Sequence, residues 1–271
     1  MCFKKIWNWI LNQGTPPPQP PPPIPGEKRR IAILAAINNY PGSANDLNGC
    51  LNDIDDVELK LKNEFPAFMI KKIKDSQVTV EGMYNQIKDV LVTLTAGDVL
   101  YWHYSGHGTQ IPSNSEPNGY HEALYLYNGP FLDDQVQELQ ALTPEGVHVI
   151  AKFDSCFSGD MLRNSKKTQN RFYPMPGLRV RHKPIRRFGK RASLKGWVVF
   201  SGCGEAQTSA DAYINGRFNG AFTYYDNKSF SVDSTNDDEI TKLHTFLPKG
   251  SYDQNPTIDG DSSLFTEKVF T

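Results

Sequence analysis

The chain has 271 residues, 38% of them apolar, with 29 Lys or Arg against 30 Asp or Glu, so it suits one large or two small folded domains. No apolar run comes near the roughly 20 residues that are needed to cross a bilayer. The four cysteines form neither a CxxC pair nor a zinc-binding spacing, which predicts reduced thiols and a cytoplasmic location.

Two unusual segments come first in the chain. Residues 1–14 place five apolar side chains at helical spacing around Lys4 and Lys5. This pattern predicts a short amphipathic helix that docks on a partner, on a membrane surface or on its own domain. In the following segment, 15–28, eight of the first eleven residues are proline. This composition predicts an extended linker, either a plain spacer or a ligand for a proline-binding module.

From residue 29 onwards, strand patterns alternate with helical patterns. The continuous apolar run at 31–37 is typical of a central parallel strand that is buried on both faces. Further strands are predicted at 68–73, 98–104, 120–127, 147–153, 197–201 and 264–270. Helices are predicted at 45–63, 79–94, 133–142, 216–225 and 237–246. This alternation predicts an α/β fold with a mostly parallel central sheet of about six strands and helices on both faces.

Two of these strands run out into short polar stretches that carry reactive side chains. His107 follows strand 98–104, and Cys156 follows strand 147–153. If the strands are parallel neighbours, the two residues meet at the carboxyl edge of the sheet, where ligands of α/β proteins collect. A thiol beside an imidazole is the minimal apparatus of nucleophilic acyl transfer. Taken singly, a buried cysteine is more often inert and a lone histidine more often structural.

The two motifs resemble those of a known family. YWHYSGHGTQ and FDSCFSGD look like the histidine and cysteine motifs of metacaspases, the Arg/Lys-directed relatives of caspases. The 49 residues between His107 and Cys156 match the roughly 50 residues found in caspases. The resemblance extends from about residue 30 to the carboxyl terminus through three further stretches: 43–53, 122–134 and 201–225. It implies a caspase-like fold with a large-subunit-like part (29–160), a basic loop (161–195) and a small-subunit-like part (196–271).

The resemblance also implies catalytic roles for individual residues. Cys156 would be the nucleophile, and His107 would be the general base and acid. The backbone N–H groups of Gly108 and Cys156 would form the oxyanion hole. Glycines around both motifs would in any case leave room for a peptide backbone and free N–H groups to face an oxyanion.

A pocket for a basic P1 side chain is implied by Asp53 and Asp154, with Ser105 in the same pocket. A buried carboxylate pair is costly unless a cation enters, and a guanidinium satisfies it with paired, charge-assisted hydrogen bonds. Without the resemblance, Asp53 could be a charge on a helix surface and Asp154 a loop cap.

Calcium is a further expectation from the resemblance, since many metacaspases are calcium-activated. Asp133, Asp134 and Glu122 would be the ligands, although calcium requires six to eight oxygen atoms. The sequence departs from the family pattern at Arg163, seven residues past the cysteine, and at Phe157, which replaces the usual histidine. The alternative is that the two aspartates are ordinary first-turn charges of a helix.

The balanced net charge conceals a basic stretch. Between residues 161 and 204 there are twelve Lys or Arg and no Asp or Glu. An Arg/Lys-specific protease could cut itself in this stretch, within 161–195. A solvated loop or a nucleic-acid patch is the plainer reading of such a run, but no stacking aromatic residues accompany it, so no nucleic-acid partner is expected.

The sequence therefore predicts a cysteine endopeptidase that cuts protein or peptide substrates after Arg or Lys. The enzyme is expected to be a monomer. Residues 1–25 could contact a partner or a membrane. One alternative is a catalytically silent scaffold of the same fold, which would need neither His107 nor Cys156. The other is a related peptidase of the legumain or gingipain type. An aspartate-cleaving caspase is disfavoured, because its pocket should carry arginine where this chain has Asp53 and Asp154.

Overall fold

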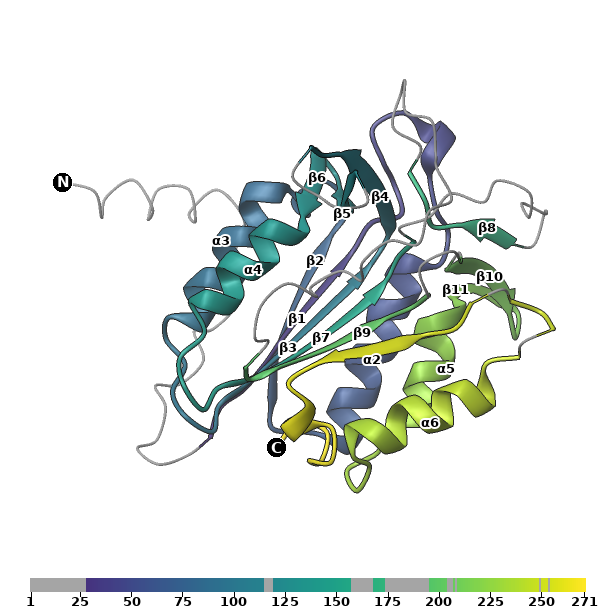
Figure 1. The fold of residues 1–271 in the computed structure, drawn as a ribbon. Helices are drawn as coiled ribbons and strands as arrows, with labels where there is room; N and C mark the ends of the chain where they lie inside the picture. Colours follow the sequence, from purple (N-terminus) through teal and green to yellow (C-terminus); the bar gives the residue numbers. More distant parts are fainter. Residues whose placement is uncertain are drawn as a thin grey trace, which may run out of the picture.

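A six-stranded sheet forms the centre of the part of the chain that the structure describes (Figure 1). The structure is a computed structural model, and it describes residues 28–114, 119–156, 168–173, 195–203, 207, 209–248, 250–252 and 254–271. The predictions for residues 1–14, for the proline-rich linker up to residue 27 and for most of the basic loop lie outside the described residues.

The strands of the central sheet are β1 (Arg30–Ala36), β2 (Phe68–Lys74), β3 (Val99–Ser105), β7 (His148–Asp154), β9 (Trp197–Ser201) and β12 (Thr257–Gly260). Their spatial order is β12-β9-β7-β3-β1-β2. All neighbours are parallel except β12, which runs antiparallel to β9 at one edge. The predicted mostly parallel sheet of about six strands is confirmed.

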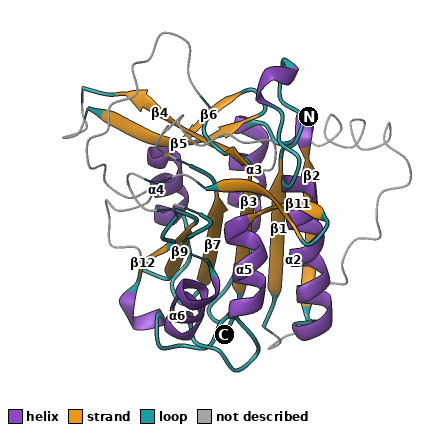
Figure 2. Cartoon of the chain, turned by 90° about the vertical axis from the view of Figure 1, so that its right-hand side faces the viewer, coloured by secondary structure: helices purple, strands orange, loops and turns teal. Residues whose placement is uncertain are grey.

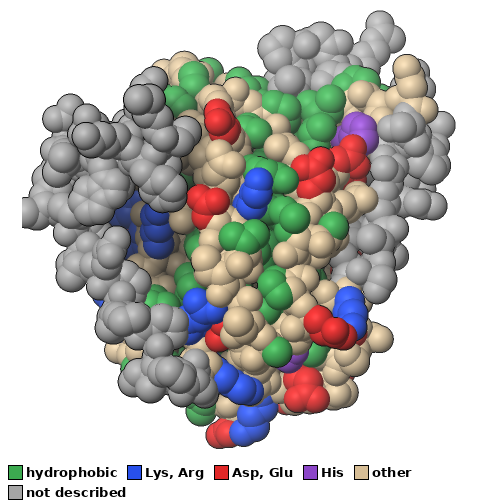
Figure 3. Space-filling view, turned by 90° about the vertical axis from the view of Figure 1, so that its left-hand side faces the viewer, with side chains coloured by type: hydrophobic (Ala, Val, Ile, Leu, Met, Phe, Trp, Pro, Cys, Tyr) green, Lys and Arg blue, Asp and Glu red, His purple; other side chains and the backbone are tan. Residues whose placement is uncertain are grey.

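Helices cover both faces of this sheet, as predicted. On one face lie α2 (Cys50–Glu64), α5 (Ala221–Ser229) and α6 (Asn236–Phe246), and on the other lie α3 (Val80–Leu91) and α4 (Asp133–Ala141) (Figures 1 and 2). Because both faces are covered, every residue of β3 is buried. On the side of α3 and α4, the visible charged and apolar side chains are interspersed (Figure 3). No helix in the described residues is long and apolar enough to span a membrane.

Two small antiparallel sheets lie beyond the carboxyl ends of the central parallel strands (Figure 1). One contains β4 (His107–Pro112), β5 (Tyr120–Leu126) and β6 (Gly129–Leu132), and the other contains β8 (Thr168–Asn170), β10 (Ala210–Ile214) and β11 (Arg217–Gly220). Of these six strands, the sequence predicted only β5. The small sheets matter because they flank the edge of the central sheet at which β3 and β7 end.

The helix predicted at 45–63 begins five residues later than expected. Residues Ser43–Asn45 form a separate 3-10 helix, and α2 starts at Cys50. The side chain of Asn38 accepts a hydrogen bond from the backbone N–H of Cys50 at 2.9 Å. A distant carboxylate, Asp211, accepts from the N–H of Gly49 at 2.9 Å. These acceptors satisfy N–H groups at the true helix start, and the carboxylate is invisible to local periodicity.

Two other predicted elements differ from the structure, one in part and one in kind. The segment 216–225 was predicted as a helix, and its second half does lie in α5, but Asn215 and Gly216 have φ values of 48° and 91° and turn the chain between β10 and β11. An Asn-Gly pair is a strong hairpin signal, so the sequence did carry this information. The segment 264–270 is not a strand. Its apolar residues Leu264, Val269 and Phe270 are buried, but they lie in a 3-10 helix and in turns. The edge strand of the sheet is β12 instead.

A buried ion cluster ties the central sheet to the helices on one face. Lys152 in β7 is fully buried and pairs with Asp226 of α5 at 2.9 Å and with Glu239 of α6. Burial alone would lower the pKa of Lys152, but the two carboxylates outweigh it and hold this pKa above its ordinary value. Removing the cation would leave two buried carboxylates facing each other, which is the costly way to break such a cluster.

We expect Lys152→Met to lower the free energy of unfolding by about 3–5 kcal/mol, because it removes the cation that both buried carboxylates, Asp226 and Glu239, share. The same substitution at Lys62, whose ammonium lies 2.7 Å from Glu58 on an exposed helix surface, should cost at most about 1 kcal/mol. Chemical denaturation of both variants tests this. Equal losses would show that the buried cluster is not a special determinant of stability.

Candidate active site

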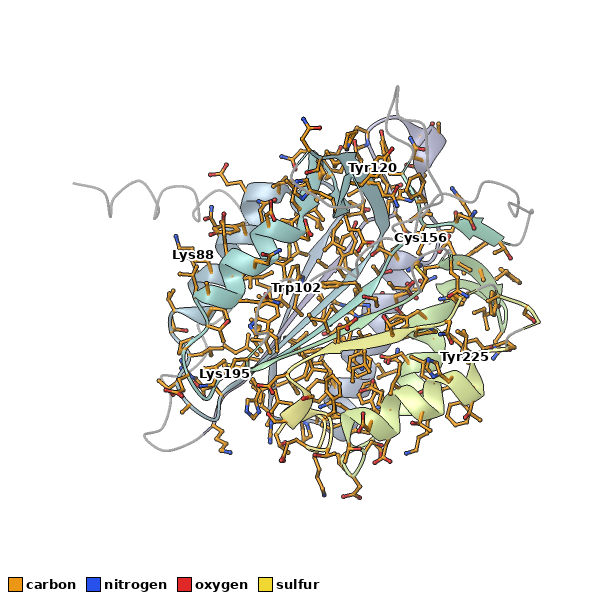
Figure 4. All side chains as sticks on the ribbon, in the orientation of Figure 1. Lys88, Trp102, Tyr120, Cys156, Lys195 and Tyr225 are labelled. Atoms are coloured by element: carbon orange, nitrogen blue, oxygen red, sulfur yellow. The ribbon has the colours of Figure 1, made fainter. Side chains whose placement is uncertain are left out.

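The ends of β3 and β7 bring His107 and Cys156 to the same place. The two strands are parallel neighbours whose last paired residues are Ser105 and Asp154. His107 and Cys156 each follow these residues by two positions, and both are buried. Gly108 lies so close that a Cβ on it would be 2.1 Å from the carbonyl oxygen of Cys156. Figure 4 shows Cys156 at this edge of the sheet.

The imidazole of His107 is held as a neutral base. Its Nε2 lies 2.7 Å from the carbonyl oxygen of Asn45, which can only accept, so Nε2 carries the proton. Its Nδ1 is buried and has no hydrogen-bond partner among the described residues. Burial lowers the pKa of His107 to about 4. The ring packs against Tyr40 with centroids 4.7 Å apart. An unprotonated, oriented nitrogen is what general-base catalysis requires.

The thiol of Cys156 contacts the backbone of Ser209. It donates to the Ser209 carbonyl oxygen at 3.3 Å and accepts from the N–H of the same residue. Burial raises the pKa of Cys156 well above its ordinary value. The thiol is therefore neutral in this state, and it needs a base to become a nucleophile.

Two backbone N–H groups beside the thiol converge on one carbonyl oxygen. The N–H of Gly108 and the N–H of Cys156 both donate to the carbonyl of Arg171, at 2.9 and 3.1 Å. These are the two groups that the sequence analysis assigned to an oxyanion hole. Their distances to a common acceptor fall in the range that such a hole requires.

The guanidinium of the same arginine fills a buried acidic pocket. Arg171 Nη2 lies 2.8 Å from Asp53 and 2.9 Å from Asp211, and Nη1 lies 3.2 Å from Asp154. Nη1 also donates to the hydroxyl of Ser105 at 2.7 Å. All these side chains are buried. The structure thus brings Asp53, Asp154 and Ser105 together, as predicted, and adds Asp211.

The three carboxylates are positioned by donors other than Arg171. Asp53 accepts from the N–H of Gly220 at 2.8 Å, and Asp154 accepts from the N–H and hydroxyl of Thr223 at 2.9 and 2.7 Å. Asp211 accepts from two N–H groups before α2. Burial raises the pKa of Asp53 to about 6, against the opposing effect of Arg171. The pocket is therefore a preorganised acceptor site for a cation.

Two residues of this site were missed by sequence reasoning. Asp211 lies in the short apolar strand β10, where a charged residue is unusual, and this was the available signal. Asn45 contributes only its backbone carbonyl, so its side-chain type gave no indication of the contact with His107.

The predicted calcium ligands are only partly brought together. Among the described residues, His121, Asp133 and Asp134 form a group whose ligand atoms all lie within 4.8 Å of one another. Glu122, the residue after His121 in β5, is not part of this group, because neighbouring strand residues point to opposite faces. One imidazole and two carboxylates do not fit calcium, which takes six to eight oxygen ligands.

We expect Gly220→Ala to disturb the acidic pocket. A Cβ at this position would lie 2.0 Å from Asp154 Oδ2 and 2.5 Å from Arg171 Nη1, and overpacking of this kind costs about 1–3 kcal/mol. The control is Gly250→Ala, where a Cβ would meet nothing within 4 Å. Chemical denaturation should show a clear loss for the first variant and little change for the second. Similar curves for both would mean that the pocket tolerates the extra atom.

The chain is similar in sequence to proteins of a known family. The model of the family "Metacaspase, peptidase C14 domain" matches residues 30–165. Metacaspase-1 of Candida albicans is 29% identical over 254 residues, covering 72% of this chain and 56% of the relative. Metacaspase-5 of Trypanosoma cruzi is 31% identical over 199 residues, covering 67% of this chain and 44% of the relative. The chain thus spans about half the length of the curated relatives it matches.

One solved structure has a similar fold over almost the whole length of both chains. The crystal structure of a protein from Geobacter sulfurreducens superposes with a TM-score of 0.69 at 23% identity, covering 90% of this chain and 98% of that one. This likeness supports the fold, and the family match covers both reactive motifs, including His107 and Cys156. The resemblance drawn from those motifs is confirmed: the chain belongs to the metacaspase family of peptidase C14 domains.

Proposed function

We propose that this chain is a cysteine endopeptidase that cuts peptide bonds after Arg or Lys, in protein substrates and within its own basic loop. One observation carries this proposal. A single arginine, Arg171, has its carbonyl on the N–H groups of Gly108 and Cys156 and its guanidinium in the acidic pocket. A peptide with arginine before the cut bond would need the same two contacts at the same time.

The reaction follows from the groups around Cys156. Its thiol would give a proton to the free Nδ1 of His107 and attack the substrate carbonyl. The developing oxyanion would receive hydrogen bonds from Gly108 and Cys156. His107 would then return the proton to the leaving amine, and water would hydrolyse the thioester. The carbonyl of Asn45 would stabilise the imidazolium that forms in between.

The choice of a basic side chain follows from the charges in the pocket. Asp53, Asp154 and Asp211 are buried, and all three carboxylates contact the same guanidinium, that of Arg171. An acidic side chain would add a fourth carboxylate with no cation, which is strongly unfavourable in a buried site. Lysine can supply one charge, but it lacks the planar, bidentate geometry of arginine.

Short fluorogenic peptides that end in Arg, Lys or Asp test this function on the full chain. We expect kcat/KM for Arg to exceed that for Asp at least about 100-fold, since each charge-assisted hydrogen bond contributes about 1.5–3 kcal/mol. Cys156→Ala should abolish the hydrolysis. Preferential cleavage after Asp, or cleavage that survives this substitution, would contradict the proposal. Millimolar calcium against a chelator, in the same assay, tests the prediction of calcium activation.

The acid limb of the pH profile should reflect the pocket before it reflects the catalytic base. Asp53 has a pKa of about 6 with a guanidinium beside it, whereas that of His107 is about 4. Without a bound cation the pKa of Asp53 rises further, so the free pocket starts to lose charge already above pH 6 as the pH falls. We expect KM for an Arg peptide to rise there while kcat changes little. An acid limb confined to kcat would contradict this assignment.

A further inference from the structure

The segment Thr168–Asn170 pairs with the site as an added strand. As β8 it runs antiparallel to β10, with Asn170 opposite Ala210 and Thr168 opposite Ala212. The next residue, Arg171, continues this pairing through its N–H, which donates to the Ser209 carbonyl at 3.1 Å. Proteins commonly bind an extended peptide in this way, as an extra strand at a sheet edge.

The residues after Arg171 also contact the site. Phe172 forms a parallel bridge with Gly108, and the N–H of Tyr173 donates to the Gly108 carbonyl at 2.8 Å. The hydroxyl of Thr109 donates to the Tyr173 carbonyl at 2.8 Å. The segment 168–173 therefore has backbone contacts before and after the Arg171 carbonyl, like a substrate that passes through a cleft.

From this arrangement, and resting on the proposed function, we infer that Arg171–Phe172 is the bond at which the chain cuts itself. Until that cut, the segment 168–173 blocks the site against other substrates. A tethered ligand of this kind acts at an effective concentration of roughly millimolar or more, so a free peptide must compete with it. Both the acidic pocket and the two oxyanion donors are occupied in the uncut chain.

The cut is balanced with the groups already described. The sulfur of Cys156 bonds to the carbonyl carbon of Arg171 while its proton passes to His107. The bond to the nitrogen of Phe172 then breaks, and that amine takes the proton from His107. Water hydrolyses the thioester, which leaves a carboxylate on Arg171, an amino terminus on Phe172 and the free thiol. The two new ends are then no longer joined across the site.

The first experiment follows the full wild-type chain by intact mass and by amino-terminal sequencing. We expect two fragments, 1–171 and 172–271, with Phe172 as the new terminus, and a rate that does not depend on protein concentration. Arg179→Gln, a change of another arginine of the same basic stretch, should be cut equally fast. Cys156→Ala should stay intact. A chain that hydrolyses Arg peptides but remains uncut at this bond would overturn the inference and leave the proposed function standing.

Two uncut variants separate occupation of the site from cleavage. Phe172→Pro keeps Arg171, and it keeps the hydrogen bonds of the Arg171 carbonyl and the Tyr173 N–H, but its tertiary amide should resist cutting. Arg171→Gln removes the cation that holds the segment. We expect Phe172→Pro to hydrolyse an Arg peptide at least about tenfold more slowly than the cut wild type, and Arg171→Gln to be active without a lag.

Each outcome of this comparison is decisive. If uncut Phe172→Pro is as active as the cut wild type, the segment does not block the site and the inference is wrong. This holds even if Arg171→Gln fails to fold because three buried carboxylates lose their cation. If no folded variant hydrolyses any Arg or Lys peptide, the proposed function fails, and the inference fails with it.

A second inference rests on the side chain of Tyr173. Its ring stacks on Tyr125 of β5 with centroids 3.6 Å apart and planes at 13°. We infer that Tyr125 forms a subsite for an aromatic residue two positions after the cut bond. Stacked pairs contribute about 0.5–1.5 kcal/mol beyond their burial, which corresponds to a preference of about 2–13-fold.

Internally quenched peptides with Arg before the cut and either Tyr or Ala two positions after it test this subsite. With the cut enzyme, we expect the Tyr peptide to have the higher kcat/KM by this factor. In Tyr125→Leu the ratio of the two values should fall towards one. An unchanged ratio in that variant, or no preference in the wild type, would exclude Tyr125 as a determinant of specificity.

Discussion

The site depends on one interaction, the pairing of a single guanidinium with three buried carboxylates. Arg171 joins α2 through Asp53, β7 through Asp154 and β10 through Asp211. Without a cation these groups would face one another in a buried space, where like charges cannot all remain ionised. Burial raises the pKa of Asp53 first, and the charge of Asp154 raises it further. A positive charge is therefore a requirement of the pocket, whether the chain or a substrate supplies it.

The buried ion clusters around Arg171 and Lys152 differ in how their carboxylates are held. Asp53, Asp154 and Asp211 each accept hydrogen bonds from backbone N–H groups, so their positions do not depend on the cation. Around Lys152, by contrast, Asp226 and Glu239 each have an oxygen with no hydrogen-bond partner among the described residues. The first arrangement suits a cation that can be exchanged. The second suits one that stays in place.

His107 and Cys156 are both uncharged in this structure, in which the segment 168–173 contacts the site through Arg171. Burial lowers the pKa of His107 and raises that of Cys156, and both shifts favour the neutral thiol and neutral imidazole. In the proposed reaction, the proton would pass from the thiol to the imidazole as the sulfur attacks. The surrounding groups, which are the Asn45 carbonyl and the Gly108 and Cys156 N–H groups, are already placed for the charges that this transfer would create.

The sequence by itself determined the parallel strands of the central sheet, most of its flanking helices and the positions of His107 and Cys156, but not the antiparallel edge strand β12. These features are encoded locally, because a continuous apolar run predicts a buried strand and the residue after it lies at the sheet edge. The hairpin turn at Asn215 and Gly216 was also encoded locally, although Gly216 was predicted as the first residue of a helix.

Only the tertiary structure decided which charges meet. Asp211 reaches the pocket from a strand that follows the basic loop, and Arg171 reaches it from within that loop. The Asn45 carbonyl reaches His107 from the connection between β1 and α2. Such contacts join residues 40 to 118 positions apart, and no local period records them. A basic run in the sequence looks the same whether its arginines are solvated or, like Arg171, buried among carboxylates.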